Sequence, residues 1–226
     1  MHNPQERQSN YRLLIFDWDG TLSDSLQHIV HSVRFAADKL DFPKRSDEEI
    51  KNIIGLGLAE AMQSLFPEIN DLQRDALTEH YRSYYLATTG DGVDLYPDVK
   101  KTIKQLYEDG YDLAVATGKS RRGLDRALSE SGLVDYFHYS RCADETFSKP
   151  HPLMLEDIID YSGADKAEVL MIGDTEHDLQ MANNAGICSA AVTYGAQSSD
   201  YLSKFKPATF FDNLRQLRPW LSKNIL

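Results

Sequence analysis

Apolar runs and helical spacings alternate along most of the chain. The run "LLIF" within residues 11–16 is apolar throughout, which predicts a strand buried on both faces. Comparable runs follow in "YDLAVAT", "EVLMIG" and "ICSAAVTY", with weaker ones in "FHYS" and "ATFF". Between them, apolar residues recur three and four positions apart, which predicts helices over 99–110, 120–131, 152–161, 175–185 and 213–221. Repeated strand–helix units indicate a parallel sheet with helices on both sides.

Residues 25–88 follow a different pattern, because no convincing strand interrupts their helical spacing. Ser46 and Glu49 predict a capping box at the start of one of these helices. We therefore expect an α/β protein with a Rossmann-like parallel sheet core, residues 1–23 and 90–226, and an inserted small all-helical cap domain, residues 24–89. Such an insertion would lie over the carboxyl ends of the strands, where open α/β sheets bind ligands.

Composition narrows the class of partner. The 226 residues are 42% hydrophobic and carry a net charge of −11, which opposes nonspecific binding to nucleic acid or to anionic membranes. No apolar run approaches the roughly 20 residues of a membrane helix, and the first residues lack an apolar signal core. The two cysteines, Cys142 and Cys188, give no disulfide framework. We expect a cytoplasmic protein without nucleic-acid or membrane partners; the pattern gives no oligomeric state.

Two aspartates follow the first predicted strand in "LLIFDWDGTLSDS". Asp17 and Asp19 are two positions apart, so in an extended segment they face the same way and Trp18 points aside. Two carboxylates this close repel each other, and a divalent cation that prefers oxygen ligands, such as Mg²⁺, relieves that repulsion. A strand followed by an ordinary aspartate turn would contain the same residues, so the motif alone leaves both interpretations open.

Two later segments place polar groups at comparable positions. In "VATGK", Thr117 and Gly118 offer a hydroxyl and backbone N–H groups to a phosphate, although Ser120 could simply begin a helix there. In "SKPHP", Lys149 precedes a proline that restricts its backbone, and its ammonium could neutralise an anion. A solvated surface lysine would fit the same letters.

A further acidic pair follows the predicted strand "EVLMIG". Asp174 comes directly after this strand, where a helix start does not require an acid. Asp178 lies four residues on, and a capping pair with Thr175 at the start of a helix would be enough to explain it. The four segments occur in order, each just past a predicted strand or at the start of a helix. This combination favours one shared site over coincidence.

In this combination the chain resembles the haloacid dehalogenase-like hydrolase superfamily. "DWDGTLSDS" resembles its first motif, "VATGK" its second, Lys149-Pro150 its third and "GDTEHD" its fourth, and the resemblance extends over residues 12–221. "IIGLGLAEAM" and "LYPDVKKTIKQL" are similar to the phosphoglycolate phosphatase-like branch. Two positions depart from the usual pattern: Trp18, where a smaller or aliphatic residue is common, and Asp98, where glycine commonly follows the proline.

The resemblance implies a Mg²⁺-dependent phosphatase that hydrolyses a small phosphorylated metabolite, similar to phosphoglycolate, through an aspartyl-phosphate. Asp17 would be the nucleophile, and Asp19 would protonate the leaving oxygen and then deprotonate the attacking water. Asp17, Asp174 and the backbone carbonyl of Asp19 would bind Mg²⁺. Asp178 would orient that shell of ligands.

The resemblance also implies a set of groups that grip the phosphoryl oxygens. These are the side chains of Thr117 and Lys149, together with backbone groups at Trp18, Asp19 and Gly118. The helical cap would close to exclude water during the first step. Substrate choice would depend on the cap, with residues 55–58 and Arg34 as candidates.

Other reactions of this superfamily stay open. Dehalogenases lack the second acid, so Asp19 favours phosphoryl transfer. Sugar phosphomutases usually carry a histidine twelve positions after the nucleophile, where this chain has Ile29 with His28 adjacent. A phosphonate hydrolase would need a cap lysine, and no motif selects Lys39 or Lys51. Inorganic pyrophosphate is a further candidate substrate, and a receiver-like phosphoacceptor switch is the non-enzymatic alternative.

Overall fold

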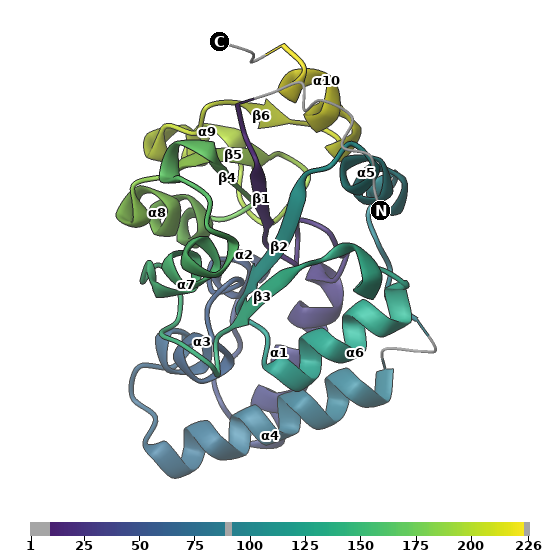
Figure 1. Cartoon of the computed structure of the whole chain (residues 1–226). Coiled ribbons are helices and arrows are strands. Elements are labelled where there is room, and N and C mark those ends of the chain that lie inside the picture. The colour runs from purple at the N-terminus through teal and green to yellow at the C-terminus, as the bar shows by residue number, and fades with distance from the viewer. Residues whose placement is uncertain (1–9, 89–91, 224–226) are drawn as a thin grey trace.

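The computed structural model describes residues 10–88 and 92–223. Within these residues, six parallel strands form one sheet in the order β3-β2-β1-β4-β5-β6 (Figure 1). The strands are β1 (Leu13–Phe16), β2 (Asp112–Thr117), β3 (Tyr139–Cys142), β4 (Val169–Gly173), β5 (Cys188–Val192) and β6 (Phe210–Phe211). This is the strand order of the Rossmann fold, so the predicted α/β class with a Rossmann-like parallel sheet is confirmed.

Helices cover both faces of the sheet. One face packs against α5 (Val99–Glu108), α6 (Arg121–Ser131) and α10 (Leu217–Leu221), and the other against α7 (Leu153–Ser162) and α8 (Glu176–Ala185). The short α9 (Ser199–Leu202) lies beside β5. Single 3₁₀ turns are formed by Val134–Tyr136, Lys166–Glu168, Ser203–Phe205 and Leu214–Gln216. None of the described helices is long and apolar enough to cross a membrane.

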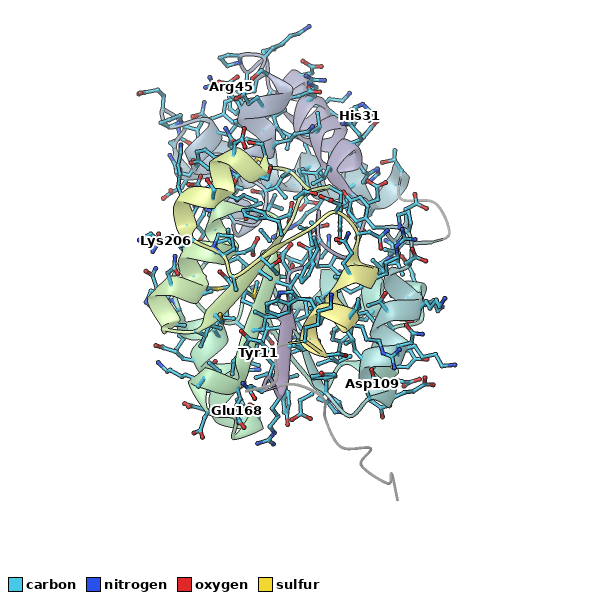
Figure 2. The ribbon with its side chains drawn as sticks, turned by 90° about the horizontal axis from the view of Figure 1, so that it is seen from above. Tyr11, His31, Arg45, Asp109, Glu168 and Lys206 are labelled. Atoms are coloured by element: carbon cyan, nitrogen blue, oxygen red, sulfur yellow. The ribbon has the colours of Figure 1, made fainter. Side chains whose placement is uncertain are left out.

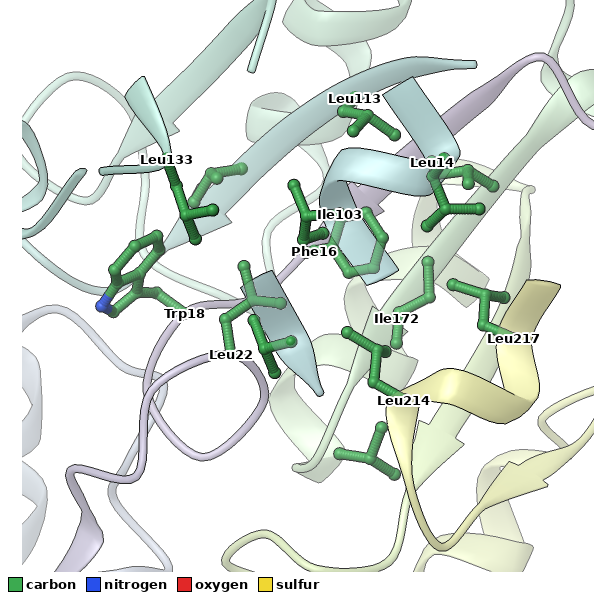
Figure 3. Packing of buried hydrophobic residues seen from close by; sticks show 14 of the residues in the cluster. Leu14, Phe16, Trp18, Leu22, Ile103, Leu113, Leu133, Ile172, Leu214 and Leu217 are labelled. Atoms are coloured by element: carbon green, nitrogen blue, oxygen red, sulfur yellow. The ribbon is translucent and has the colours of Figure 1, made fainter. Parts of the chain in front are cut away.

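Side chains of β1 alternate between the two faces of the sheet. Leu14 and Phe16 join the cluster under α5, α6 and α10, whereas Leu13 and Ile15 join the cluster under α7 and α8. All four are fully buried, as expected of a central strand in a parallel sheet. The first cluster also contains Trp18, which Figure 3 shows among its leucines. Trp18 therefore points into the core, as the two-residue alternation predicts.

Four helices between β1 and β2 form a separate group, which we call the helical block (residues 26–88). They are α1 (Leu26–Lys39), α2 (Asp47–Lys51), α3 (Leu58–Leu65) and α4 (Asp71–Thr88). Their buried side chains form a hydrophobic cluster of their own, and α1 packs along α4 (Figure 1). The predicted capping box is present at α2, where Ser46 and Glu49 each accept a hydrogen bond from the other's backbone N–H.

The helical block lies toward the carboxyl ends of the strands. In Figure 2, His31 and Arg45 of the block are at one end of the molecule. Tyr11 and Glu168, which lie just before the first residues of β1 and β4, are at the opposite end. The strands therefore point toward the block, so residues that follow a strand lie between the sheet and the block.

The segments that lead into and out of the helical block pair with each other. Tyr96 N donates to Leu22 O at 3.0 Å, and Asp24 N donates to Asp94 O at 2.9 Å. We call these two segments, residues 22–24 and 94–96, the stem. The block is thus joined to the sheet through two adjacent, hydrogen-bonded segments.

Two predicted elements are displaced from their expected positions. The strand expected at "FHYS" is found at Tyr139–Cys142, because Val134–Tyr136 form a 3₁₀ turn and Tyr139 is the first residue in register with β2. The last helix begins with the 3₁₀ turn Leu214–Gln216, where the side chain of Asn213 accepts a backbone hydrogen bond. Both differences depend on local turns that the apolar spacing does not report.

Candidate active site

The predicted site residues gather where the order of the strands reverses. Asp17 follows β1 and Asp174 follows β4, and these strands are neighbours in the sheet. The pairing extends past β1, because Asp17 N donates to Ile172 O at 2.9 Å. In open α/β sheets the carboxyl ends of two such strands form the usual ligand crevice.

The turn after Asp17 brings the first motif against Asp174. Gly20 has a φ of 87°, a left-handed conformation that favours glycine. Thr21 Oγ1 donates to Asp174 Oδ1 at 2.9 Å, and Ala196 N donates to Asp174 Oδ2 at 2.8 Å. Two other segments, one of them distant in the sequence, therefore fix the position of this buried carboxylate.

Lys149 connects Asp17 with Asp178. Its buried ammonium donates to Asp17 Oδ1 at 2.5 Å and to Asp178 Oδ1 at 2.6 Å. Asp178 Oδ2 accepts from the N–H and the hydroxyl of Thr175, so the predicted helix cap is present as well. Burial alone would lower the pKa of Lys149, but the charges of Asp17 and Asp178 raise it, and the net shift is upward. Lys149 is therefore a buried cation and not a solvated surface lysine.

Three carboxylates share this buried space. Asp17, Asp174 and Asp178 each offer one oxygen within 4.8 Å of the others. Burial raises the pKa of Asp17 well above its ordinary value, and the negative charges of the other two aspartates add to the shift against the opposing effect of Lys149. Burial also raises the pKa of Asp174 to about 7, and the charge of Asp178 adds to it. One ammonium cannot neutralise three ionised carboxylates, so the cluster is short of positive charge.

This cluster has the chemistry of a site for a divalent cation. Asp17 Oδ2 is buried and has no hydrogen-bond partner among the described residues. Both oxygens of Asp178 are already engaged, by Lys149 and by Thr175. Carboxylate oxygens with uncompensated negative charge suit Mg²⁺. Asp17 and Asp174 therefore fit as direct ligands, and Asp178 fits as a residue that orients the others.

The carboxylate of Asp19 lies outside the three-carboxylate cluster. Its Oδ1 accepts from Ser25 Oγ at 2.7 Å and lies 2.9 Å from Lys119 Nζ. Asp19 is 9% exposed, whereas Asp17 and Asp174 are at most 1% exposed. The two carboxylates of the first motif therefore have different surroundings. The metal ligand predicted at this position is the backbone carbonyl of Asp19, which stays a prediction.

The predicted phosphate-binding groups flank the cluster. Thr117 is the last residue of β2, the strand on the other side of β1, and its Oγ1 accepts from Lys119 N at 3.2 Å. Neither the N–H of Trp18 nor that of Asp19 donates to an acceptor within residues 10–88 and 92–223. Two backbone donors beside Asp17 are thus free to bind an anion.

The helical block touches the core next to these groups. A Cβ added to Gly118 would lie 2.3 Å from Leu56 O, so only glycine allows the block's backbone to come this close. Gly57 N donates to Ser148 Oγ at 2.7 Å, one residue before the lysine of the third motif. Residues 55–58, a predicted specificity segment, therefore contact the core beside the predicted site.

Sequence reasoning did not single out Lys119 or Tyr85, although both lie close to Asp19. Lys119 is two residues after Thr117 in the same motif, and this closeness to a predicted phosphate-binding residue could have identified it. Nothing in the helical spacing of α4 distinguishes Tyr85 from its neighbours. Arg34, the other candidate for specificity, forms an ion pair with Asp47 in a partly exposed position.

Comparison with known protein families shows which family has these motifs. Residues 14–192, which include all of these side chains, match the model of the haloacid dehalogenase-like hydrolases. The chain belongs to this family. It is 32% identical over 219 residues to the phosphoglycolate phosphatase of Vibrio vulnificus (strain YJ016), covering 93% of this chain and 96% of that protein. It is 29% identical over 210 residues to pyrophosphatase PpaX of Bacillus cereus (strain AH820), covering 92% and 95%.

A solved structure matches most of the chain. The crystal structure of a predicted phosphoglycolate phosphatase from Haemophilus somnus 129pt matches with a TM-score of 0.85 at 25% identity, covering 94% of this chain and 98% of that one. These likenesses confirm the predicted superfamily and its phosphoglycolate phosphatase-like branch. They also confirm the predicted class of enzyme, a phosphoric monoester hydrolase.

Proposed function

We propose that this hydrolase is a Mg²⁺-dependent phosphatase that acts on a small phosphorylated metabolite, similar to phosphoglycolate, through an aspartyl-phosphate on Asp17. The observation that carries the proposal is the position of Asp17. It follows the central strand, contacts the buried ammonium of Lys149 and shares a cluster with Asp174 and Asp178. A carboxylate in such surroundings can attack phosphorus while nearby positive charge stabilises the transition state.

The two aspartates of the first motif would divide the chemistry. In the first step, a carboxylate oxygen of Asp17 forms a bond to phosphorus, the bond from phosphorus to the leaving oxygen breaks, and protonated Asp19 gives its proton to that oxygen. In the second step, Asp19 takes a proton from water, the water oxygen bonds to phosphorus, and the bond to Asp17 breaks. The products are inorganic phosphate and an alcohol, and Asp19 is again protonated.

The phosphoryl oxygens would be held during both steps by Thr117, Lys149, Gly118 and the N–H groups of Trp18 and Asp19. Support comes from the two N–H groups, which have no acceptor in the described chain. Positioning of this kind and charge stabilisation account for most of the catalysis of phosphoryl transfer.

Asp17, Asp174 and the backbone carbonyl of Asp19 would hold Mg²⁺. Bound there, the ion supplies positive charge beside the phosphoryl group and keeps Asp17 ionised. Asp178 would orient this shell through its contacts with Lys149 and Thr175. The unpartnered oxygen of Asp17 and the excess of buried carboxylates support this assignment.

We also propose that residues 24–89 act as a cap domain over the site, inserted into a core of residues 1–23 and 90–226. The separate hydrophobic cluster of the helical block, its attachment through the stem and its contacts at Gly118 and Ser148 support this division. A cap in this position would exclude water during the first step and contact the leaving group.

Turnover with p-nitrophenyl phosphate and Mg²⁺ tests the proposal. A phosphatase is expected to release many equivalents of p-nitrophenol per protein, because Asp17 is regenerated in every cycle. The assay follows product by absorbance against protein concentration. Release of at most about one equivalent would contradict the proposal and indicate a phosphoacceptor that does not turn over.

Inorganic pyrophosphate is the second candidate substrate, because one relative of similar length is a pyrophosphatase. A panel that contains phosphoglycolate, pyrophosphate and sugar phosphates separates the candidates by kcat/KM. The mutase alternative lacks support, because Ile29 is apolar and is buried in the cluster of the helical block. That position therefore cannot supply the proton transfer that a histidine would make.

Alanine at Gly20 is expected to disturb the acidic cluster. The new Cβ would lie 2.2 Å from Asp174 Oδ2, and the left-handed backbone adds strain. We expect Gly20→Ala to lower kcat/KM at least about tenfold and to raise the Mg²⁺ concentration needed for half-maximal activity, because Asp174 must move. Steady-state kinetics over a Mg²⁺ titration measures both effects.

Gly110 offers a matched control for this substitution. Its φ of 85° is close to that of Gly20, but a Cβ added there would meet nothing within 4 Å. Gly110→Ala should therefore have a similar backbone cost, about 1–2 kcal/mol, without a contact to the site. If both variants kept full kcat/KM and the same Mg²⁺ requirement, the close approach of Gly20 to Asp174 would have no role in activity.

A further inference from the structure

Lys119 is a partly buried cation, with a side chain that is 14% exposed, and the proposed mechanism does not use it. Its Nζ lies 2.9 Å from Asp19 Oδ1 and 3.3 Å from the hydroxyl of Tyr85, and it lies 5.0 Å from the centre of the Tyr85 ring. The side chain therefore contacts a carboxylate of the core and a tyrosine of the helical block.

The carboxylate of Asp19 is fixed from one side. Ser25 Oγ donates to Asp19 Oδ1 at 2.7 Å, and Lys119 approaches the same oxygen. With both contacts on Oδ1, the oxygen left to exchange a proton with a reactant is Oδ2. General acid–base catalysis depends on such fixed geometry, since small misplacements of a catalytic group reduce rates strongly.

Tyr85 is itself held in place by the packing of the helical block. Its ring packs edge-on against His28 of α1 at 4.4 Å between centroids and stacks with Tyr81 of α4 at 5.7 Å. Burial raises the pKa of Tyr85, so its hydroxyl stays neutral and can accept from the ammonium. Tyr85 thus packs against α1 and against its own helix at the point where its hydroxyl contacts Lys119.

We propose that Lys119 is a positioning residue that fixes the orientation of Asp19 and couples it to the helical block through Tyr85. The inference rests on the proposed function, because it requires Asp19 to be the acid–base. Asp19 and Lys119 belong to the core and Tyr85 belongs to α4. The chain of contacts from Asp19 to Tyr85 is therefore complete only while α4 lies against the core. Asp19 would be fully oriented for proton transfer only when the block covers the site.

Three substitutions separate the parts of this chain of contacts. Lys119→Met removes the charge at similar length, Lys119→Arg keeps a cation, and Tyr85→Phe removes only the hydroxyl. Lys104→Met and Tyr84→Phe are matched controls. Lys104 is an exposed lysine of α5. Tyr84 is on α4, like Tyr85, but its ring stacks on Phe35 of α1.

The expected results are changes in kcat rather than in KM, measured with the fastest monoester of the substrate panel. Lys119→Met should lower kcat about tenfold or more and change KM less than about threefold, because it acts on proton transfer and not on substrate binding. Lys119→Arg should retain more activity than Lys119→Met. Tyr85→Phe should lower kcat about two- to tenfold, because it removes one hydrogen bond that acts on Asp19 only through Lys119. The two controls should match the unmodified protein.

A double substitution tests whether Lys119 acts through Asp19. In a protein that already carries Asp19→Asn, adding Lys119→Met should cause no further loss of kcat, because the group it positions is gone. An equal loss in both backgrounds would overturn the inference, and so would a raised KM with unchanged kcat, since either result would mean that Lys119 contacts the substrate. Full kcat in Tyr85→Phe would overturn the coupling to the helical block.

Folding and the parent proposal are tested separately. Thermal unfolding shows whether Lys119→Met folds, and if it does not, Lys119→Arg and Tyr85→Phe carry the test. Full activity of Asp19→Asn would contradict the acid–base role itself and with it the proposed function. Full activity of Lys119→Met beside an inactive Asp19→Asn would overturn only the positioning role.

Discussion

Asp17→Asn is expected to abolish turnover while the protein still folds. An amide cannot form the bond to phosphorus, so we expect kcat to fall at least about 10⁴-fold, as when other enzymes lose a nucleophile. The fold should persist, because the substituted amide keeps an oxygen that can accept from Lys149, and Lys149 also keeps its bond to Asp178. Steady-state kinetics measures the loss, and trapping of ³²P-labelled protein should detect a phosphoenzyme in the unmodified protein but not in the variant.

Asp75→Asn is the matched control, because Asp75 lies on α4 with a side chain that is 73% exposed. It should keep full activity, and the melting temperatures of both variants should stay within about 3 °C of the unmodified protein, a change of about 1 kcal/mol. Full phosphatase activity in Asp17→Asn would refute its assignment as the nucleophile.

Removal of divalent cations is expected to silence the enzyme reversibly. Dialysis against a chelator should remove activity, and added Mg²⁺ should restore it, because the buried carboxylates hold more negative charge than Lys149 neutralises. Asp174→Asn should raise the Mg²⁺ concentration for half-maximal activity by at least about 100-fold. The same titration followed by melting temperature should show that Mg²⁺ stabilises the unmodified protein more than the variant.

Activity that survives exhaustive chelation would contradict a metal role for Asp174. Asp75→Asn again serves as the control and should respond to Mg²⁺ like the unmodified protein. The melting-temperature measurement is independent of catalysis, so a variant that is inactive for another reason would still show unaltered Mg²⁺ binding.

The sheet and the positions of its functional residues followed from the sequence for one physical reason. Parallel strands buried on both faces are read as continuous apolar runs, and all their carboxyl ends meet at one edge of the sheet. Residues just past those runs were therefore expected close together, and Asp17, Asp174 and Lys149 do lie together. Their chemical roles depend on the experiments above.

The contact between Lys119 and Tyr85 could not be predicted in the same way. It depends on how α4 lies against the core, and helical spacing shows which face of a helix is buried but not what it packs against. Lys119 and Tyr85 are 34 residues apart and meet only in the folded chain. The two-residue spacing predicts that Asp17 and Asp19 face the same way, but it does not give the partners of their carboxylates, which are Lys149 for Asp17 and Ser25 with Lys119 for Asp19.

Asp98 illustrates a departure from the family pattern that the backbone explains. It has a φ of 67° at the N-cap of α5, a left-handed conformation that glycine adopts without strain. The structure thus accounts for the usual glycine at this position, which sequence comparison alone records only as a preference.

The paired stem has a consequence for how such proteins can diverge. Because residues 22–24 and 94–96 hydrogen-bond to each other, the entrance and exit of the inserted helices stay adjacent whatever lies between them. The register of β1 with β2 therefore does not depend on the length or sequence of the insert. A different insert could therefore be joined to the same two segments. Such an exchange would change which substrate is bound and leave the acidic cluster intact.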